Sequence, residues 1–462
     1  MEFSSIVFLI WFLPLCSLCY FAAPRSWKNF VLLGFSLLFY GWSRPEWLLL
    51  IGFECLVGYG CGLWMEKLAG RKRQLVLIFG VVIICALLFW FKYFNFFAAI
   101  AGEIFNVDLM VKTIILPIGI SFYTFQILSY LADAYTGRSP VQKSLLRFCL
   151  YVCMFFQLIA GPIVRYSEIE GQLDYRHRHL SWQKTQKGAS KFVCGLAKKV
   201  LIANQLSSLS VFFRSVSTPS VLFYWLNGLA VTLFIYYDFS GYSDMAIGLG
   251  QMMGFRLPEN FDYPFLEGSF TDFWRHWHMT LTRWFRDYVY IPLGGNRKGK
   301  ARQIFNLFVV WLLTGLWHGA AWNFVFWGLL FFVLLTLEKF VIPVSWQNTW
   351  WYRLVFLCGI LLSFVLFYDD SLAQFQSDLQ AMFGLSGLPL TNGVTIYTLL
   401  SNLILFIVAI AGCFPVWKRK YHQLINRSQT GWMEPTGMVL ILILCIAWLA
   451  AGTFNPFLYF RF

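Results

Sequence analysis

The chain has 462 residues, of which 59% are hydrophobic, 20% are aromatic and only 13% are charged, and its mean hydropathy is +0.63. Soluble domains carry about 25% charged residues, so this composition excludes a soluble globular protein and indicates a polytopic membrane protein. The net charge of +14 comes from basic residues in short loops between apolar runs, where they set membrane topology and contact anionic lipids. We therefore expect no nucleic-acid partner.

Apolar runs recur from end to end of the chain. They predict an all-α membrane protein with about 11–13 transmembrane or re-entrant helices. Two stretches, 145–160 and the glycine-containing 239–253, are candidates for partial or re-entrant segments, since such backbone is tolerated where it is buried or lines a cavity. The expected spans are roughly 3–22, 29–48, 49–65, 75–98, 113–131, 145–160, 190–212, 219–238, 303–316, 320–338, 352–368, 396–413 and 437–453.

Basic residues in the loops predict the orientation of the chain, because cytoplasmic loops are enriched in Lys and Arg. The acidic segment 369–380 and both ends of the chain, including Phe462, are then expected outside. The loops expected inside contain Arg25 and Lys28; Lys67, Arg71, Lys72 and Arg73; Arg138, Lys143 and Arg147; the stretch from Arg165 to Lys199; Arg297, Lys298, Lys300 and Arg302; and Lys418, Arg419 and Lys420.

The stretch from Arg165 to Lys199 combines basic residues with Leu180 and Trp182. This mixture is typical of an amphipathic helix in the cytoplasmic headgroup layer. It is either a plain lipid-surface helix, which we favour, or a basic rim for a phosphate-bearing acyl donor such as a coenzyme A thioester. Its basic residues include Arg176, His177, Arg178, His179, Lys184, Lys187, Lys191, Lys198 and Lys199.

Two polar islands occur in the first half of the chain. In Leu116–Gln126, Pro117 and Gly119 break a helix, and neighbouring hydroxyls can satisfy the freed backbone groups. In Gln157–Tyr166, Gly161-Pro162 predicts a sharp turn, with Arg165 just beyond it, as in a re-entrant hairpin.

A third island, Tyr237–Asp244, sets two carboxylates and two serine hydroxyl groups beside an apolar span. Asp238 or Asp244 can orient an imidazole, or can cap a helix that starts near Met245. For Asp244 we favour the cap. Ser240 and Tyr242 complete this island as candidate supporting residues.

The fourth island, Phe273 to Arg297, alternates tryptophan with arginine and ends in a turn that contains Asn296. Interfacial anchoring and cation–π contacts explain much of this pattern. They do not explain why a histidine follows a tryptophan both at Trp277-His278 and at Trp317-His318. The arginine and acidic members of the island are Arg275, Arg283, Arg286, Asp287 and Arg297.

His318 is the one ionisable side chain in the apolar run from Phe305 to Phe332. An ionisable group at membrane depth is costly, so it indicates a functional site unless a neighbouring carbonyl satisfies it. The small residues Gly319, Ala320 and Ala321 allow a ligand or a helix to approach its backbone. No metal is expected, because the 11 cysteines lie mostly in apolar segments and few lie near a histidine.

These islands, in this order, resemble the membrane-bound O-acyltransferase family, and most closely its bacterial branch of alginate, peptidoglycan and cellulose O-acetyltransferases. The teichoic-acid D-alanyl transfer protein is more distant. The resemblance covers nearly the whole chain, so residues 1–462 are expected to form a single integral membrane acyltransferase domain with a core at about 110–340. The matching blocks are Leu116–Gln126, Gln157–Tyr166, Asp238–Asp244, Asp272–Arg297, Gly315–Trp322 and Asn455–Phe462.

The resemblance implies a ring of tilted helices around a central funnel or tunnel. The invariant histidine of the family maps onto His318 and a second polar position onto His278, so these two are the expected catalytic residues. His276 departs from the Arg or Asn expected there and is interpreted as tuning. The expected supporting or tunnel-lining residues are Trp317, Trp277, Asp238, Ser240, Tyr242, Asp244, Gln126, Arg275, Arg286, Asp287 and Asn296.

A neutral imidazole can act as a general base or can accept an acyl group, and burial favours the neutral form. We therefore expect His318 to serve in one of these roles, with His278 or Asp238 orienting it. The donor would be acetyl-CoA or another cytoplasmic acyl thioester, with no bound cofactor. The acetyl group would reach an extracytoplasmic polysaccharide across the bacterial plasma membrane, helped by a separate SGNH-type acetyltransferase.

Two alternatives use the same pattern. The chain can transfer D-alanine to teichoic acid by a related mechanism, or it can transport an acyl carrier or polymer without chemistry. The sequence shows no internal repeat, whereas transporters built from inverted repeats show two similar halves, so the transporter is the weaker alternative. A third alternative is an acyltransferase that acts on a lipid or a protein, since nothing in the sequence identifies the acceptor.

Overall fold

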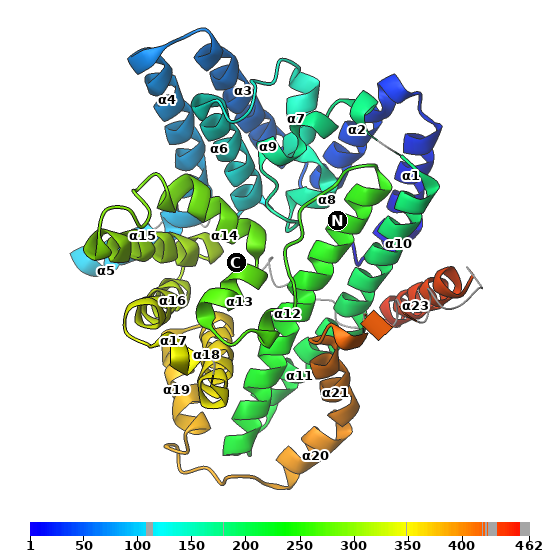
Figure 1. The fold of residues 1–462 in the computed structure, drawn as a ribbon. Helices are drawn as coiled ribbons and strands as arrows, with labels where there is room; N and C mark the ends of the chain where they lie inside the picture. Colours follow the sequence, from blue (N-terminus) through cyan, green and yellow to red (C-terminus); the bar gives the residue numbers. More distant parts are fainter. Residues whose placement is uncertain are drawn as a thin grey trace. The chain divides into compact units, whose positions relative to one another are not determined.

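The computed structural model describes residues 1–107, 114–178, 180–347, 349–417, 419–420, 423 and 432–452. Across these ranges the regular structure is helical and contains no strand (Figure 1). The prediction of an all-α polytopic membrane protein is confirmed. His179, Lys418 and the expected family block Asn455–Phe462 lie outside the described residues.

The chain divides into two compact units. The first unit consists of Met1–Phe192, Ser243–Glu259 and Arg283–Val289, and the second of Val193–Tyr242, Asn260–Thr282 and Tyr290–Phe462. Both histidines of the expected site, His278 and His318, belong to the second unit.

The elements that lie mainly in the first unit are largely N-terminal. They are α1 (Leu13–Ala22), α2 (Lys28–Gly41), α3 (Trp47–Glu66), α4 (Gly70–Leu88), α5 (Phe94–Phe105), α6 (Ile120–Thr136), α7 (Leu145–Cys153), α8 (Phe155–Leu158), α9 (Tyr166–Ile169) and most of α10 (Trp182–Ala197). The second unit holds α11 (Asn204–Ser215), most of α12 (Val221–Met252), α13 (Phe270–His276), α15 (Lys300–His318), α16 (Trp322–Phe340), α17 (Val344–Gln347), α18 (Trp350–Tyr368), α19 (Leu372–Met382), α20 (Gly393–Ser401), α21 (Leu403–Gly412) and α23 (Met433–Ala450). Helix α14 (Met279–Phe285) has residues in both units.

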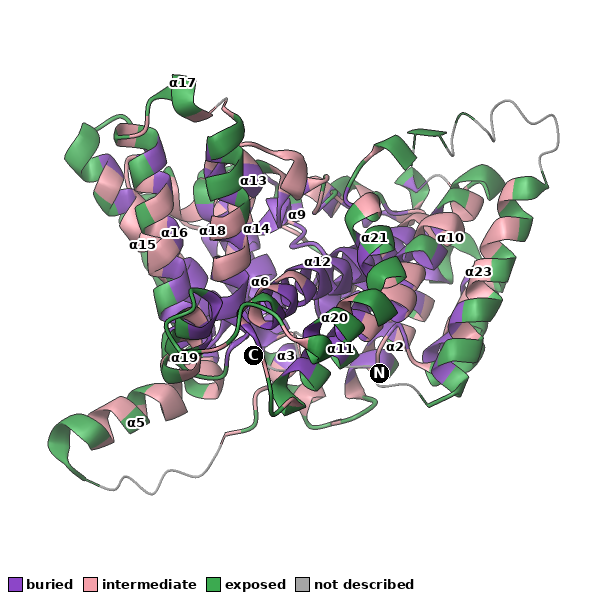
Figure 2. Ribbon diagram, turned by 90° about the horizontal axis from the view of Figure 1, so that it is seen from below, coloured by how far each residue is buried: buried purple, intermediate pink, exposed green. Residues whose placement is uncertain are grey.

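Six of the described helices are long and apolar enough to cross a membrane. They are α3, the continuous run Gly70–Phe105 that contains α4 and α5, α12, α16, α18 and α23; the bent pair α20 and α21 makes a seventh if it is one span. The apolar part of α12 is 72% buried and that of α23 is 11% buried, a contrast visible in Figure 2. The ring of about 11–13 helices with a central funnel stays a prediction.

Helix α12 corrects one expectation from the sequence. It runs without a break from Val221 to Met252, so no helix starts near Met245 and neither Asp238 nor Asp244 is an N-cap. Gly241 remains helical because it packs closely on α10: a Cβ there would lie 2.8 Å from the backbone oxygen of Gly195. The region 145–160, in contrast, is broken as expected, with α7 ending at Cys153 and α8 beginning at Phe155.

An ion pair inside the second unit joins α12 to the π-helical turn η6 (Lys198–Ala203). The Nζ atom of Lys199 lies 2.5 Å from Oδ1 of Asp238, and the two side chains are 2% and 0% exposed. Lys199 therefore does not contribute to the expected basic rim, because its ammonium is buried against a carboxylate.

Helices α15 and α16 form an antiparallel hairpin whose contact depends on glycine. A Cβ at Gly328 would lie 2.3 Å from the backbone oxygen of Trp311, and a Cβ at Gly315 would lie 2.4 Å from that of Phe324. Small residues let helix backbones approach closely where lipid supplies no hydrophobic driving force. This contact holds the C-terminal end of α15, where His318 lies, against α16.

The carboxylate of Glu338 on α16 holds the start of α13. It accepts hydrogen bonds from the backbone N–H groups of Phe270 and Thr271, at 2.7 and 2.8 Å, and from the hydroxyl of Tyr352 on α18, at 2.8 Å. Unpaired N–H groups at a helix start favour such an anion. Glu338 thus links three helices at the segment that leads to His278.

We expect Gly328→Ala to destabilise the protein by about 1–3 kcal/mol, because the added methyl group overlaps the backbone of α15. The measurement is the thermal unfolding midpoint of purified protein in detergent. Gly60→Ala on α3 is the matched control, since a Cβ at Gly60 meets nothing within 4 Å. An unfolding midpoint for Gly328→Ala equal to that of the control would refute the close contact.

Asp238→Ala is expected to lower the free energy of unfolding by about 3–5 kcal/mol, because it leaves the Lys199 ammonium buried without its carboxylate. The single variant should therefore yield less folded protein, measured as the amount of monodisperse protein extracted from membranes. The double variant Asp238→Ala, Lys199→Met removes both charges and should restore most of that yield. Equal losses in the single and double variants would show that the ion pair is not the source of the stability.

Candidate active site

His318 is the last residue of α15, at the turn of the α15–α16 hairpin. The helix ends there because Gly319 and Ala321 adopt extended backbone before α16 begins at Trp322. A side chain at position 319 would collide with the ring of Phe324, at 2.3 Å, so the turn requires glycine. The small residues after His318 thus serve the packing of the turn.

Aromatic rings surround His318. Its imidazole centroid lies 4.9 Å from that of Trp327, 5.0 Å from that of Trp317 and 5.2 Å from that of Phe367, all in edge-on geometry. The residue is 7% exposed. Such surroundings keep bulk water away from the imidazole and strengthen electrostatic interactions there.

The second expected histidine lies close to the first. His278 occupies the connection between α13 and α14, and its ring centroid is 6.4 Å from that of His318 and 5.7 Å from that of Trp317. The structure therefore brings together two residues that are 40 positions apart in the sequence, and their catalytic roles stay a prediction. Complete burial lowers the pKa of His278 to about 3, so its imidazole is neutral.

Asn260, which the sequence analysis missed, contacts His278 directly. Its Oδ1 atom lies 3.2 Å from Nδ1 of His278, 3.2 Å from the backbone nitrogen of Thr280 and 2.9 Å from the Thr280 hydroxyl oxygen. Asn260 precedes His278 by 18 residues in an irregular segment. No periodic pattern points to it, and only the fold brings it to the histidine.

The other residues of the second unit that were expected to support the site differ in burial and in their partners. Trp277 is buried and stacks on Phe273 at 5.4 Å. Arg275 forms an exposed ion pair with Asp272, at 2.6 Å, and Asn296 is exposed in the loop before α15. Trp317, Asp238, Ser240 and Tyr242 are buried, and Asp238 is paired with Lys199 as described above.

Four of the expected supporting residues belong to the first unit. Asp244 lies 3.7 Å from Lys191, and Asp287 pairs with Arg165 and, at 2.8 Å, with Arg286. Gln126 is completely buried, and its amide has no hydrogen-bond partner among the described residues.

The alternative interpretation of the stretch from Arg165 to Lys199, a basic rim for the acyl donor, keeps only some of its residues. Arg178 is buried and donates hydrogen bonds to Tyr20 and Asn29, and Lys191 pairs with Glu259. Lys184 and Lys187 on α10 are exposed. Arg178 and Lys199 were wrongly counted among the residues of such a rim, because the local density of charge does not show which basic side chains are buried against a partner.

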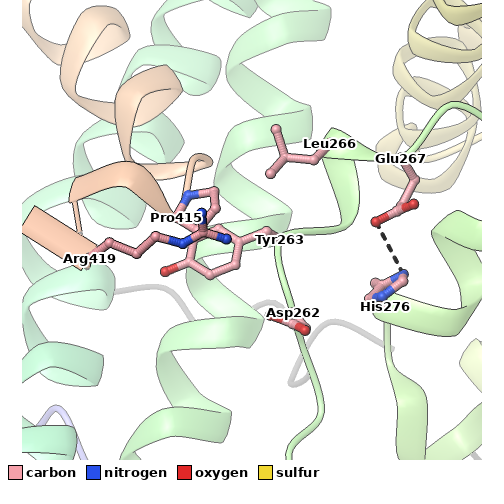
Figure 3. A pocket seen from close by; sticks show the side chains of 7 residues that line it. All are labelled: Asp262, Tyr263, Leu266, Glu267, His276, Pro415 and Arg419. Atoms are coloured by element: carbon pink, nitrogen blue, oxygen red, sulfur yellow. Dashed lines mark ion pairs between the residues drawn. The ribbon is translucent and has the colours of Figure 1, made fainter.

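His276 faces a pocket rather than the histidine pair (Figure 3). Its Nδ1 atom lies 3.4 Å from Glu267 and 2.9 Å from the backbone oxygen of Asp272. The pocket has a volume of about 400 Å³ and is lined by Asp262, Tyr263, Leu266, Glu267, His276, Pro415 and Arg419. Among the described residues no group of three His, Cys, Asp or Glu side chains could hold a metal ion.

Comparisons with known proteins bear on the family of the chain. Residues 47–377 match the model of the membrane-bound O-acyltransferase family, a longer region than the expected core of about 110–340. The probable alginate O-acetylase of Pseudomonas aeruginosa is 43% identical over 73% of this chain and 66% of its own length.

Two further relatives match the whole chain. The probable alginate O-acetylase of Pseudomonas putida is 36% identical over 100% of both chains. The peptidoglycan O-acetyltransferase of Helicobacter pylori is 30% identical over 100% of this chain and 97% of its own. The all-helical membrane fold, the family match and these relatives lead to one conclusion: the chain belongs to the membrane-bound O-acyltransferase family and is an acyltransferase.

Proposed function

We propose that this acyltransferase takes an acetyl group from a cytoplasmic thioester, acetyl-CoA, and delivers it across the bacterial plasma membrane for O-acetylation of an extracytoplasmic polysaccharide. The names of the relatives support an acetyl group and a glycan acceptor. The basic loops support a donor on the cytoplasmic side, with both chain ends outside. The whole chain then acts as one membrane acyltransferase domain.

The observation that carries the proposal is the position of His318, enclosed by Trp317, Trp327 and Phe367, with His278 next to it. As a general base, His318 removes the proton of the attacking hydroxyl while its oxygen attacks the thioester carbonyl. The new C–O bond forms, the C–S bond breaks, and the proton passes to the departing thiolate. In the second route, an imidazole nitrogen of His318 attacks the thioester carbonyl, and the thiolate leaves as the C–S bond breaks. The hydroxyl oxygen then takes the acyl group as the C–N bond breaks, and the hydroxyl proton passes to the thiolate.

The last transfer to the polymer is assigned to a partner. No G-x-S-x-G nucleophile motif is present in the sequence, so a separate SGNH-type acetyltransferase outside the membrane is proposed for that step. The acetyl group would leave this chain on the outer side and reach the polysaccharide through that protein.

His318→Ala is expected to lower acetyl transfer by at least about 10²-fold, because the base or acyl acceptor is removed. The assay is thioester cleavage of labelled acetyl-CoA by purified protein in lipid nanodiscs. His276→Ala is the control, since that ring faces Glu267, and it should retain activity within a few fold. Wild-type activity in His318→Ala would refute the mechanism.

Loss of this protein is expected to remove O-acetyl groups from a cell-surface glycan, because the acyl supply to the outer side stops. Mass spectrometry of the glycans with and without the protein checks this. Loss of D-alanyl esters with unchanged acetylation would instead establish the D-alanyl alternative. A strain that carries His318→Ala separates loss of the reaction from loss of the polypeptide.

A further inference from the structure

The turn that carries His278 is built around Asn260. The backbone oxygen of Asn260 accepts a hydrogen bond from the N–H of Met279, at 3.0 Å, and its side chain contacts His278 and Thr280. Asn260 is completely buried, as is His278. Side chain and backbone of one asparagine therefore hold three consecutive residues of the turn.

The contact with Thr280 identifies the amide atom that faces His278. A backbone N–H can only donate, so the Asn260 atom 3.2 Å from the Thr280 nitrogen must be the carbonyl oxygen and not the amide nitrogen. An oxygen of this kind has no proton to give. The Nδ1 atom of His278, at 3.2 Å from the same oxygen, must therefore be the donor and carry a proton.

A neutral imidazole carries one proton on its two ring nitrogens. When Nδ1 holds that proton, Nε2 has a lone pair and accepts. Packing against Phe239, at 4.6 Å, and against Trp317, at 5.7 Å, fixes the plane of the His278 ring but cannot choose which nitrogen is protonated. That choice depends on a hydrogen-bonding group, and Asn260 supplies it.

We infer that Asn260 is a positioning residue, which holds His278 in the tautomer with the proton on Nδ1 so that Nε2 accepts a proton during acyl transfer. The inference rests on the proposed catalytic role of His278. Its structural part, the tautomer of His278, can be measured without any assay of activity. In hydrolases a histidine held in the wrong tautomer loses a large part of catalysis, which shows how much such control can matter.

The first test is nitrogen-15 NMR of protein labelled at histidine and reconstituted in lipid bilayers. The signals of His278 are identified as those lost in His278→Asn. We expect protonated Nδ1 and unprotonated Nε2 in the wild type, and a shift of the proton to Nε2 in Asn260→Ala. A wild-type ring protonated on Nε2 would overturn the inference, whatever the activity.

The second test is steady-state kinetics with labelled acetyl-CoA. Asn260→Ala should lower kcat by about 10- to 100-fold while KM for the donor stays within about twofold, because the residue acts through His278 and not on the donor. The matched control is Thr280→Val, which removes one donor to Oδ1 but leaves the contact of Asn260 with His278. The control should keep both the tautomer and kcat.

Asn260→Asp keeps the inference testable if Asn260→Ala fails to fold, since a carboxylate oxygen can still accept from Nδ1. The carboxylate also favours a doubly protonated His278, which has no acceptor at Nε2. Among the rings that contact His278, namely Phe239, Phe261, Trp317 and His318, the other titratable group is His318.

Asn260→Asp should therefore keep the Nδ1 proton and most of its activity near pH 8. It should lose activity as the pH falls toward 6, where the wild type does not. A purely structural role would lower the amount of folded protein and leave the pH profile unchanged, which would contradict the inference. If the tautomer is as inferred but kcat does not respond, the role of His278 in the proposed function fails and the structural assignment stands.

Discussion

The site depends on the close contact between α15 and α16. Gly315 and Gly328 allow the two backbones to touch, and the hairpin turn that follows carries His318 into a ring of aromatic side chains. In a membrane, apolar burial does not by itself bring helices together, so such close contacts decide where helix ends lie. The imidazole of His318 is thus held by backbone packing and aromatic contacts.

Buried polar groups hold the other half of the site. Glu338 fixes the start of α13, and Asn260 fixes the turn at its end, so both ends of the short helix before His278 are tied by side chains from elsewhere in the chain. Each of these groups would be costly in lipid without its partners. Polar contacts here serve geometry, which a catalytic site needs more than added stability.

Apolar length is a local signal, so the sequence alone predicted the fold class. The pairing of His278 with His318 was implied by the family resemblance, since no local pattern brings together residues 40 positions apart. A helix start near Met245 was predicted wrongly, because a carboxylate such as Asp244 just before it is typical of an N-cap, whereas α12 runs without a break from Val221 to Met252. The burial of Lys199 and the contact of Asn260 with His278 could not be predicted from the sequence either. Each depends on a partner more than 15 residues away, 39 for Lys199 and 18 for Asn260.

The backbone conformation at His278 limits which types of residue can occupy this position. Its φ angle is +43°, in the left-handed region, where asparagine, aspartate and histidine are tolerated far better than β-branched or bulky apolar residues. The residues that suit this conformation are mostly those able to exchange hydrogen bonds with a substrate. Apart from glycine, the turn therefore favours polar side chains at position 278, whatever their role there.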